Sequence, residues 1–267
     1  MLTLLHFITT HPDWEQLLLA HPYRIRMKRE NGYIILCYRS RSDYNIDLVR
    51  ECRGIILDET DNYRPVCVPF FKFSDYGEAA PNPIDWKTAR VQEKIDGSLI
   101  KVWWDKGEWH VSTNKMINAA SARFNDSKES FLDFFHKAWK KTGVNFNDLN
   151  RDYTYMFELV SPKVRIVVPY KQMNIYHIGT RDNKTLKELD LDIGVKKPRE
   201  FAITSIETCI EAAKRLGKKQ EGFVVVDSQW HRIKVKSPEY IKIHEKIQKT
   251  LHYSNPDEVA KDDPQTT

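Results

Sequence analysis

The amino-acid sequence predicts an α+β fold in which helices flank antiparallel sheets. Three observations predict it. β-rich apolar runs separated by tight turns dominate the first half of the chain, and helix-period apolar spacing becomes clear only after residue 130. Neither an internal repeat nor an interdomain linker is evident. We therefore expect a single domain over residues 1–252 and a polar, disordered tail over residues 253–267.

Two turn signals predict β-hairpins. Asn31-Gly32 and Asp105-Lys106-Gly107 are short Gly-containing turns of the kind that join antiparallel strands. The runs that flank them, together with two further short apolar runs, are the expected strands: residues 23–28, 33–38, 54–57, 66–73, 99–104 and 108–113.

Helices are expected where apolar residues recur at helical spacing. One such stripe comprises Phe131, Phe134, Phe135, Ala138 and Trp139. A second helix is expected to open with a capping box at Thr204–Glu207 and to end near Gly217. A last stripe comprises Tyr240, Ile243, Ile247 and Leu251.

Composition excludes several classes of protein. The chain has 41% apolar residues, which is enough for a sizeable core, and no run of about 18 apolar residues that could span a membrane. The apolar N-terminus lacks a basic leader, so we expect a cytoplasmic protein, in the host cytoplasm if the source is viral. The four cysteines form no CxxC pair, which argues against zinc and for reduced thiols. The net charge of +5 suits a polyanionic partner.

The segment Glu93-Lys94-Ile95-Asp96-Gly97-Ser98 carries the most chemical information. Lysine is a nucleophile only as the free amine, and its ordinary pKa of about 10.4 must be lowered by burial or by neighbouring cations. Gly97 would let a nucleotide approach the main chain. Taken alone, Lys-x-Asp-Gly is more typical of a solvated lysine in an ordinary turn.

Three later segments complete a pattern. Glu158 lies inside the apolar run 156–160, and Glu221 opens the run 221–226. In the segment 232–236, strand period places Arg232, Lys234 and Lys236 on one face. Each has an ordinary explanation: Glu158 can bond main-chain amides, Glu221 can cap an edge strand, and the cations can line a solvated face. Together they favour a site that holds a triphosphate beside Lys94.

In this order, the segments resemble the motifs shared by DNA ligases, RNA ligases and mRNA capping enzymes. Lys94-x-Asp96-Gly97 is similar to motif I, Phe157-Glu158 to motif III, Glu221-Gly222 to motif IV, and Lys234-Val235-Lys236 to motif V. Residues 175–182 are a candidate motif IIIa. The resemblance implies the nucleotidyltransferase fold and a lysyl-AMP intermediate.

Further segments are similar to the phage-type RNA ligases, specifically the RNA ligase 1 class. They are Glu51–Ile56 with Arg53, Phe70–Phe73 with Lys72, Glu158–Val167, and Lys115 after motif I. Two features depart from that class. Ser74 stands where a second aromatic residue is expected, and only about thirty residues follow motif V, too few for an appended OB domain or a helical C-terminal domain.

The resemblance implies an ATP-dependent ligase that joins the 3′-hydroxyl and 5′-phosphate ends of RNA, as in RNA repair. It makes Lys94 the nucleophile and Glu221 the contact for Mg²⁺ or Mn²⁺. The implied contacts to ATP or to the RNA phosphate are Arg53, Lys72, Glu93, Gly97, Lys115, Glu158, Tyr176, Lys234 and Lys236. The main chain around Gln92-Glu93 is expected to meet the adenine edge. Tyr176 is a candidate to stack on adenine, although aromatic residues in strands more often pack in cores.

Other functions remain open at this stage. One is a DNA nick ligase or capping guanylyltransferase, against which the missing OB domain argues. Another is a non-catalytic RNA-binding module, against which the intact motif residues argue. A third is an RNA 5′-adenylating enzyme that joins ends weakly. The sequence gives no sign of a membrane anchor or an obligate protein partner.

Overall fold

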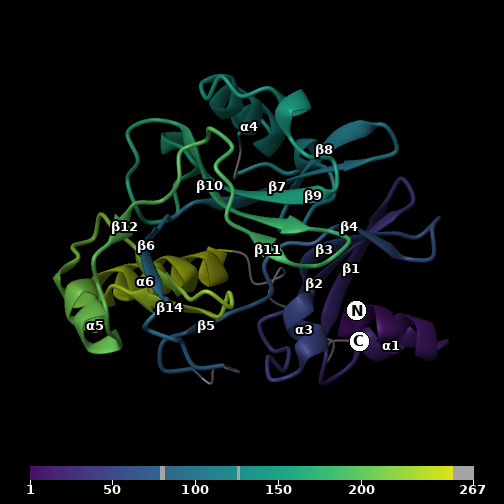
Figure 1. The fold of residues 1–267 in the computed structure, drawn as a ribbon, viewed down its shortest axis with the longest axis horizontal. Helices are drawn as coiled ribbons and strands as arrows, with labels where there is room; N and C mark the ends of the chain where they lie inside the picture. The colour runs from purple at the N-terminus through teal and green to yellow at the C-terminus, as the bar shows by residue number, and fades with distance from the viewer. Residues whose placement is uncertain (79–81, 125–126, 255–267) are drawn as a thin grey trace. The chain divides into compact units, whose positions relative to one another are not determined.

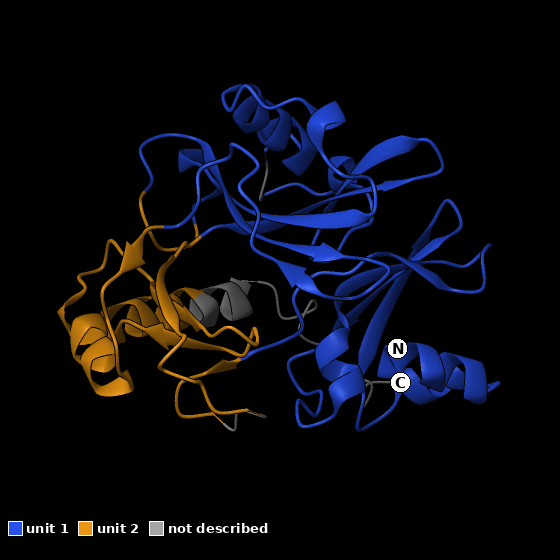
Figure 2. Ribbon diagram, in the orientation of Figure 1, with its two compact units in different colours: residues 1–73, 97–165, 170–198 blue, residues 74–96, 166–169, 199–267 orange. Residues whose placement is uncertain are grey.

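A computed structural model describes residues 1–78, 82–124 and 127–254, with side chains described only as far as Ile247 in the last helix. The chain divides into two compact units, which are described separately (Figures 1 and 2). Unit 1 comprises residues 1–73, 97–165 and 170–198, and unit 2 comprises residues 74–96, 166–169 and 199–267. Antiparallel sheets and helices occur in both, so the predicted α+β class is confirmed. The expectation of a single domain over residues 1–252 stays a prediction.

The elements of unit 1, in chain order, are α1 (Thr3–Thr10), α2 (Trp14–Leu19), β1 (Ile25–Glu30), β2 (Tyr33–Tyr38), α3 (Asp47–Glu51), β3 (Arg53–Asp58), β4 (Arg64–Cys67), β7 (Ser98–Asp105), β8 (Glu108–Thr113), α4 (Phe131–Lys140), β9 (Tyr153–Val160), β10 (Asn174–Asp182) and β11 (Glu188–Leu189), with short 3-10 turns η1 (Ala119–Ser121), η2 (Phe146–Asp148) and η3 (Pro162–Val164). Those of unit 2 are β5 (Ser74–Asp75), β6 (Arg90–Lys94), β12 (Glu200–Phe201), α5 (Ile206–Arg215), β13 (Gly222–Val226), β14 (Arg232–Lys236) and α6 (Pro238–Ser254).

The first sheet of unit 1 has the order β1-β2-β3-β4. Its first hairpin closes at Asn31-Gly32, where both residues have positive φ, as the turn signal predicted. Strand β2 is apolar at successive positions because both of its faces are covered. Ile34 and Leu36 belong to the cluster packed with α1, α2 and α3, whereas Ile35 belongs to a cluster that contains Trp103 of β7.

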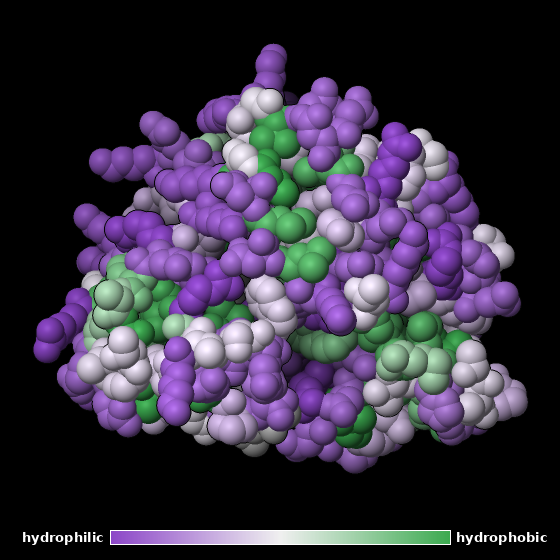
Figure 3. Space-filling view, viewed as in Figure 1, coloured by the Kyte–Doolittle hydropathy of each residue, from purple (hydrophilic) through white to green (hydrophobic). Residues whose placement is uncertain are grey.

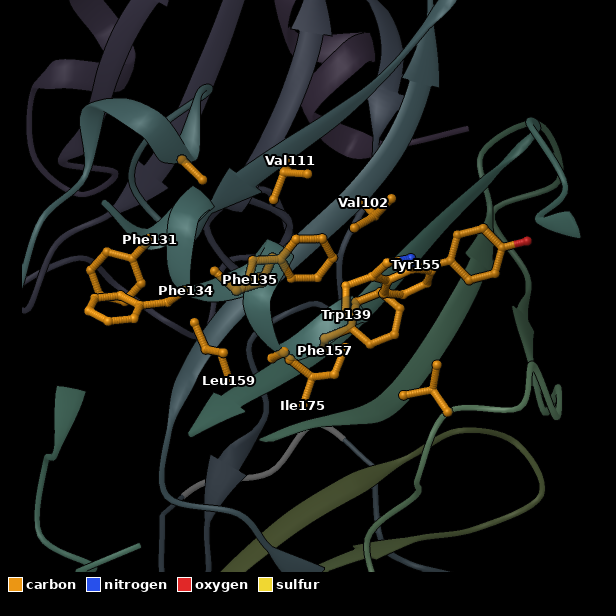
Figure 4. Close-up of a cluster of buried hydrophobic side chains, with 14 of the residues drawn as sticks. Val102, Val111, Phe131, Phe134, Phe135, Trp139, Tyr155, Phe157, Leu159 and Ile175 are labelled. Carbon is orange, nitrogen blue, oxygen red and sulfur yellow. The ribbon is translucent and has the colours of Figure 1, made fainter. Parts of the chain in front are cut away.

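The second sheet of unit 1 has the order β11-β10-β9-β7-β8. The predicted hairpin between β7 and β8 is present, with Lys106 and Gly107 at positive φ in its turn. Helix α4 covers one face, and its buried aromatic side chains pack against Tyr155 and Phe157 of β9 (Figure 4). The predicted stripe of α4 is confirmed, and a Ser130–Asp133 capping box fixes where this helix begins.

Unit 2 is built on a sheet of order β12-β6-β13-β14-β5. Its buried side chains, among them Val91, Phe223 and Val235, pack with Cys209 and Ala213 of α5. The predicted capping box at Thr204–Glu207 is wrong. Ser205 is the N-cap, and its Oγ accepts from the Thr208 N–H at 3.2 Å, so the cap lies one residue later than predicted.

Three further expectations concern the chain's surface and its end. The expected run 66–73 is a strand only as far as Cys67, because Pro69 cannot donate to a ladder. No helix among the described residues is long and apolar enough to cross a membrane. On the face drawn in Figure 3, hydrophobic residues form separate patches among hydrophilic ones. Of the predicted tail 253–267, residues 255–267 lie outside the described residues.

Candidate active site

Lys94 is the last residue of β6, in unit 2, and a row of cations shares its sheet face. In the ladder, Gly222 of β13 lies opposite Lys94 on one side and opposite Lys236 of β14 on the other. Residues in register point to the same face, so Lys94 and Lys236 flank a position that has no side chain. Lys234 lies on this face too, whereas Ile233 and Val235 are buried on the other, as strand period predicted.

Gly222 is required by its surroundings. Its φ is +151°, and a Cβ placed there would lie 2.2 Å from the Val235 carbonyl oxygen and 2.7 Å from the Lys236 Cα. Both atoms belong to the main chain of β14, which a small rotamer change cannot move. A larger residue at this position would displace the strand that carries Lys234 and Lys236.

Lys94 is paired with Glu221. Its Nζ lies 2.8 Å from Glu221 Oε2, and the side chains are 20% and 7% exposed. Burial raises the pKa of Glu221, and the nearby Lys94 ammonium opposes this shift. Burying a carboxylate costs free energy unless a cation lies beside it. The Lys94 ammonium is that cation for Glu221.

Asp75 neutralises the other two lysines. It lies on β5, which runs parallel to β14, and its carboxylate oxygens are 3.4 Å from Lys234 Nζ and 3.1 Å from Lys236 Nζ. Burial alone would raise the pKa of Asp75, but the two ammonium groups outweigh it and hold the pKa below its usual range. Asp75 was not among the predicted site residues, because its partner Lys236 is 161 positions away in the sequence.

Asp96 fixes the main chain that follows Lys94. Its side chain is buried, and its Oδ2 accepts hydrogen bonds from the Val167 and Val168 N–H groups at 2.9 and 2.6 Å. Its Oδ1 accepts from the Tyr240 hydroxyl at 2.8 Å. The aspartate of Lys-x-Asp-Gly is therefore an anchor in unit 2, and its oxygens are occupied by these donors.

Glu93 takes part in the same sheet. Its N–H donates to the Arg199 carbonyl at 2.7 Å, and its carboxylate accepts from Arg199 Nε at 2.9 Å. The expected contact between adenine and the main chain near Glu93 stays a prediction.

The remaining candidates lie in unit 1. The half-buried Glu158 is on β9, in register with Leu99 of β7 and Tyr176 of β10, on the face opposite the α4 core. The Lys196 ammonium lies 5.0 Å from the centre of the Tyr176 ring.

Gly97 approaches strand β9 closely, since a Cβ there would lie 2.5 Å from the Leu159 carbonyl oxygen. Packing against β9 is thus one reason for glycine at this position.

Arg53 and Lys72 are held by aromatic rings. The Arg53 guanidinium lies 5.5 Å from the centre of the Phe73 ring, and Lys72 Nζ lies 4.0 Å from that of Tyr44. Arg53 Nη1 is buried and makes no hydrogen bond. A buried N–H group without an acceptor is suited to a bound anion.

A buried lysine joins the segments that carry Arg53 and Lys115. Lys101 of β7 is completely buried, and its ammonium donates to the Gly54 carbonyl. Burial lowers its pKa. A Cβ on Gly54 would lie 2.5 Å from the Asn114 carbonyl oxygen, which also accepts from Cys37 Sγ at 3.1 Å. The residues next to Arg53 and Lys115 are therefore packed together, an arrangement that the sequence did not predict.

Among the residues that the structure describes, no group of three or more His, Cys, Asp or Glu side chains could hold a metal ion. The four cysteines are buried and free, in agreement with the expectation of reduced thiols.

Comparison with known proteins identifies the family. Residues 51–240 match the family model described as RNA ligase, of the T4 RNA ligase 1 type. The chain therefore belongs to this RNA ligase family, within the class of covalent nucleotidyltransferases that its motifs resemble.

Named relatives agree with this assignment. The chain is 31% identical, over 85% of its length and 36% of the relative's, to the "Putative bifunctional polynucleotide kinase/RNA ligase" of Autographa californica nuclear polyhedrosis virus. It is 25% identical to the RNA ligase of Rhodothermus phage RM378, over 72% of this chain and 59% of that one. The chain thus spans between about one third and three fifths of these relatives.

A solved structure shares the fold. An archaeal ATP-dependent RNA ligase superposes with a TM-score of 0.54 at 14% identity, over 84% of this chain and 60% of that one. The predicted nucleotidyltransferase fold of RNA ligases is confirmed.

Proposed function

We propose that the protein is an ATP-dependent RNA ligase that joins a 3′-hydroxyl to a 5′-phosphate through a lysyl-AMP intermediate on Lys94. The observation that carries the proposal is the arrangement around β13. Lys94 forms an ion pair with Glu221, and Lys236 lies on the other side of Gly222 on the same face of the sheet. Membership of the RNA ligase family supports it.

In the proposed first step, the Lys94 amine forms a bond to the α-phosphorus of ATP as the bond to pyrophosphate breaks. The Lys94 ammonium must first lose its proton to solvent, so the ion pair with Glu221 must be given up. The Lys236 ammonium on the same sheet face favours the neutral form of the Lys94 amine. Lys234 and Lys236 would exchange Asp75 for the α-phosphate and stabilise its developing charge.

In the later steps, an oxygen of the RNA 5′-phosphate attacks the same phosphorus and releases the Lys94 amine, which leaves a 5′–5′ pyrophosphate on the RNA. A 3′-hydroxyl then attacks the 5′-phosphorus of the RNA, and AMP departs. Arg53, Lys72 and Lys115 would hold phosphates, and Glu158 would contact the ribose or the metal. Tyr176 would stack on adenine.

A divalent metal, Mg²⁺ or Mn²⁺, fits Glu221. Mg²⁺ commonly takes one or two carboxylates from the protein and completes its shell with water and substrate phosphates, so one carboxylate beside Lys94 suffices. When bound, the ion would neutralise charge on the phosphates. We propose the cytoplasm as the compartment, since relatives come from a virus and a phage and the cysteines are free.

The proposal is tested by covalent labelling. After incubation with α-³²P-ATP and Mg²⁺, the label should stay on the wild-type protein in a denaturing gel and should be lost on acid treatment, as a phosphorus–nitrogen bond requires. Lys94→Ala should abolish it. Lys87→Ala, which removes an exposed lysine of unit 2, is the matched control and should retain it.

Label on Lys94→Ala would refute the assignment of the nucleophile. GTP or NAD⁺ as the preferred label donor would instead favour a capping enzyme or another ligase class. Supplying 5′-phosphorylated RNA then tests joining: circles or longer products support a ligase, and adenylated RNA alone, even when pre-adenylated RNA is supplied, supports a 5′-adenylating enzyme.

A further inference from the structure

Unit 2 contains a pocket, and of the residues that line it only Lys234 and Lys236 have a role in the proposed reaction. It has a volume of about 410 Å³ and is lined by residues of β5, β14, α5 and α6 and by Tyr76, which follows β5. Its lining includes Ile210 and Ala213 of α5, Tyr240 of α6, and Lys234 and Lys236 of β14. A volume of this size suits a nucleoside.

The pocket gathers exposed apolar surface. Tyr76 and Ile241 both line it and are 54% and 40% exposed. They are two of only four large hydrophobic residues that are exposed in the part of the chain that the structure describes. The main chain of Tyr76 is held at this edge, because its N–H donates to the Lys234 carbonyl at 2.7 Å. An exposed aromatic ring that lines a pocket offers a flat surface for a planar ligand.

The other lining residues supply charge. Lys234 and Lys236 lie within ion-pair distance of Asp75, which also lines the pocket. Lys214 lies at the end of α5 and is paired with Glu211. A ligand with a planar part beside the apolar residues and an anionic part beside the β14 lysines would match both sides, and a nucleotide has this composition.

We infer that this pocket binds the first nucleoside of the RNA strand whose 5′-phosphate is to be activated. The inference rests on the proposed function, which brings that phosphate to Lys234 and Lys236. The adenine of ATP is not the expected occupant, because neither Glu93 nor Tyr176, to which the resemblance assigns it, lines the pocket. The base would stack on Tyr76 and the sugar would pack against Ile241.

The test compares two RNAs in equilibrium binding. Both are 5′-phosphorylated single strands that carry a fluorophore at the 3′ end, and in one the first nucleotide lacks its base. Fluorescence anisotropy without ATP gives the two dissociation constants. Stacking of one base on an aromatic side chain is typically equivalent to about tenfold in affinity, so wild type should bind the intact strand about tenfold more tightly.

Variants then show which residue causes the difference between the two dissociation constants. In Tyr76→Ala the two dissociation constants should become equal, whereas Tyr76→Phe should keep the preference because the ring remains. Leu19→Ala, which removes an exposed apolar residue of unit 1, should also keep it. Because each variant is compared with itself on two strands, partial loss of folded protein does not change the ratio.

Equal binding of the two strands by wild type, or a preference that survives in Tyr76→Ala, would overturn the inference. Neither result bears on lysyl-AMP formation, which is measured separately with labelled ATP. Conversely, a wild-type protein that formed no lysyl-AMP would refute the proposed function. The ratio of the two RNA dissociation constants would still show whether Tyr76 stacks on a base.

Discussion

The cations in the segments that carry the candidate site have different partners in the two units. In unit 2 the lysines of the sheet face have carboxylate partners, Glu221 for Lys94 and Asp75 for Lys234 and Lys236. In unit 1 the corresponding contacts of Arg53 and Lys101 are an aromatic ring and a main-chain carbonyl. A lysine that exchanges its carboxylate for a phosphate keeps an anionic partner, whereas a buried N–H without an acceptor gains a partner when an anion binds.

The largest expected effect comes from breaking the Lys94–Glu221 pair in unit 2. Glu221→Gln keeps the shape but removes the proposed metal contact and the carboxylate that positions Lys94. We expect the rate of lysyl-AMP formation to fall about a thousandfold, equivalent to about 4 kcal/mol in activation free energy. Single-turnover labelling with α-³²P-ATP measures it, with Glu211→Gln on the exposed face of α5 as the control. A fall in this rate of less than tenfold would contradict a role for Glu221 in lysyl-AMP formation.

A change of pH should sharpen the comparison by acting on unit 1. His177 of β10 is buried, and burial lowers its pKa to about 4. Its folded pKa is below the unfolded value of about 6.5, so the folded state binds this proton less readily. The stability that it contributes is complete above pH 6.5 and is lost as the pH falls from 6.5 towards 4. In the same range, the lowered pKa of Asp75 keeps its ion pairs with Lys234 and Lys236 charged.

Urea unfolding at pH 7.5 and at pH 4.5 measures this effect. The loss of unfolding free energy due to His177 approaches about 3.5 kcal/mol at the acid limit, from about 1.4 kcal/mol for each pKa unit. His177→Gln should lose less stability between the two pH values than wild type does. Equal losses in both proteins would show that His177 is not the group responsible.

The smallest expected effect comes from Lys101 in unit 1. Lys101→Met keeps the volume but removes the donor to the Gly54 carbonyl, so the segments that carry Arg53 and Lys115 should be held less firmly. We expect the KM for ATP to rise about tenfold, or about 1.4 kcal/mol, with kcat changing less. Lys140→Met, at the exposed end of α4, is the control. A fall in kcat at unchanged KM would contradict a role in holding the substrate.

Local signals in the sequence predicted much of the fold. The turns at Asn31-Gly32 and Lys106-Gly107 and the apolar stripe of α4 are encoded by neighbouring residues, and the structure has them at the expected positions. Strand β6 was not predicted, because charged residues interrupt its apolar pattern. Helices α1 and α2 were also missed, since they are short and have no side-chain cap.

For the candidate site, the resemblance supplied the residues but not their partners. Asp75, Asp96 and Lys101 were missed as supporting groups because each acts on residues that are distant in the sequence. Asp96, for example, bonds Tyr240 across 144 positions. Pairings of this kind depend on which strands become neighbours, and a single sequence carries no local signal for that.

The glycine at position 222 has a consequence for genetic screens. Its place between Lys94 and Lys236 suggests a direct part in the reaction, yet it has no functional group, and any larger residue pushes against the β14 main chain. A library scored only for ligation would rank this position beside the nucleophile. Scoring the yield of correctly folded protein in parallel would reveal substitutions at 222 as failures of assembly.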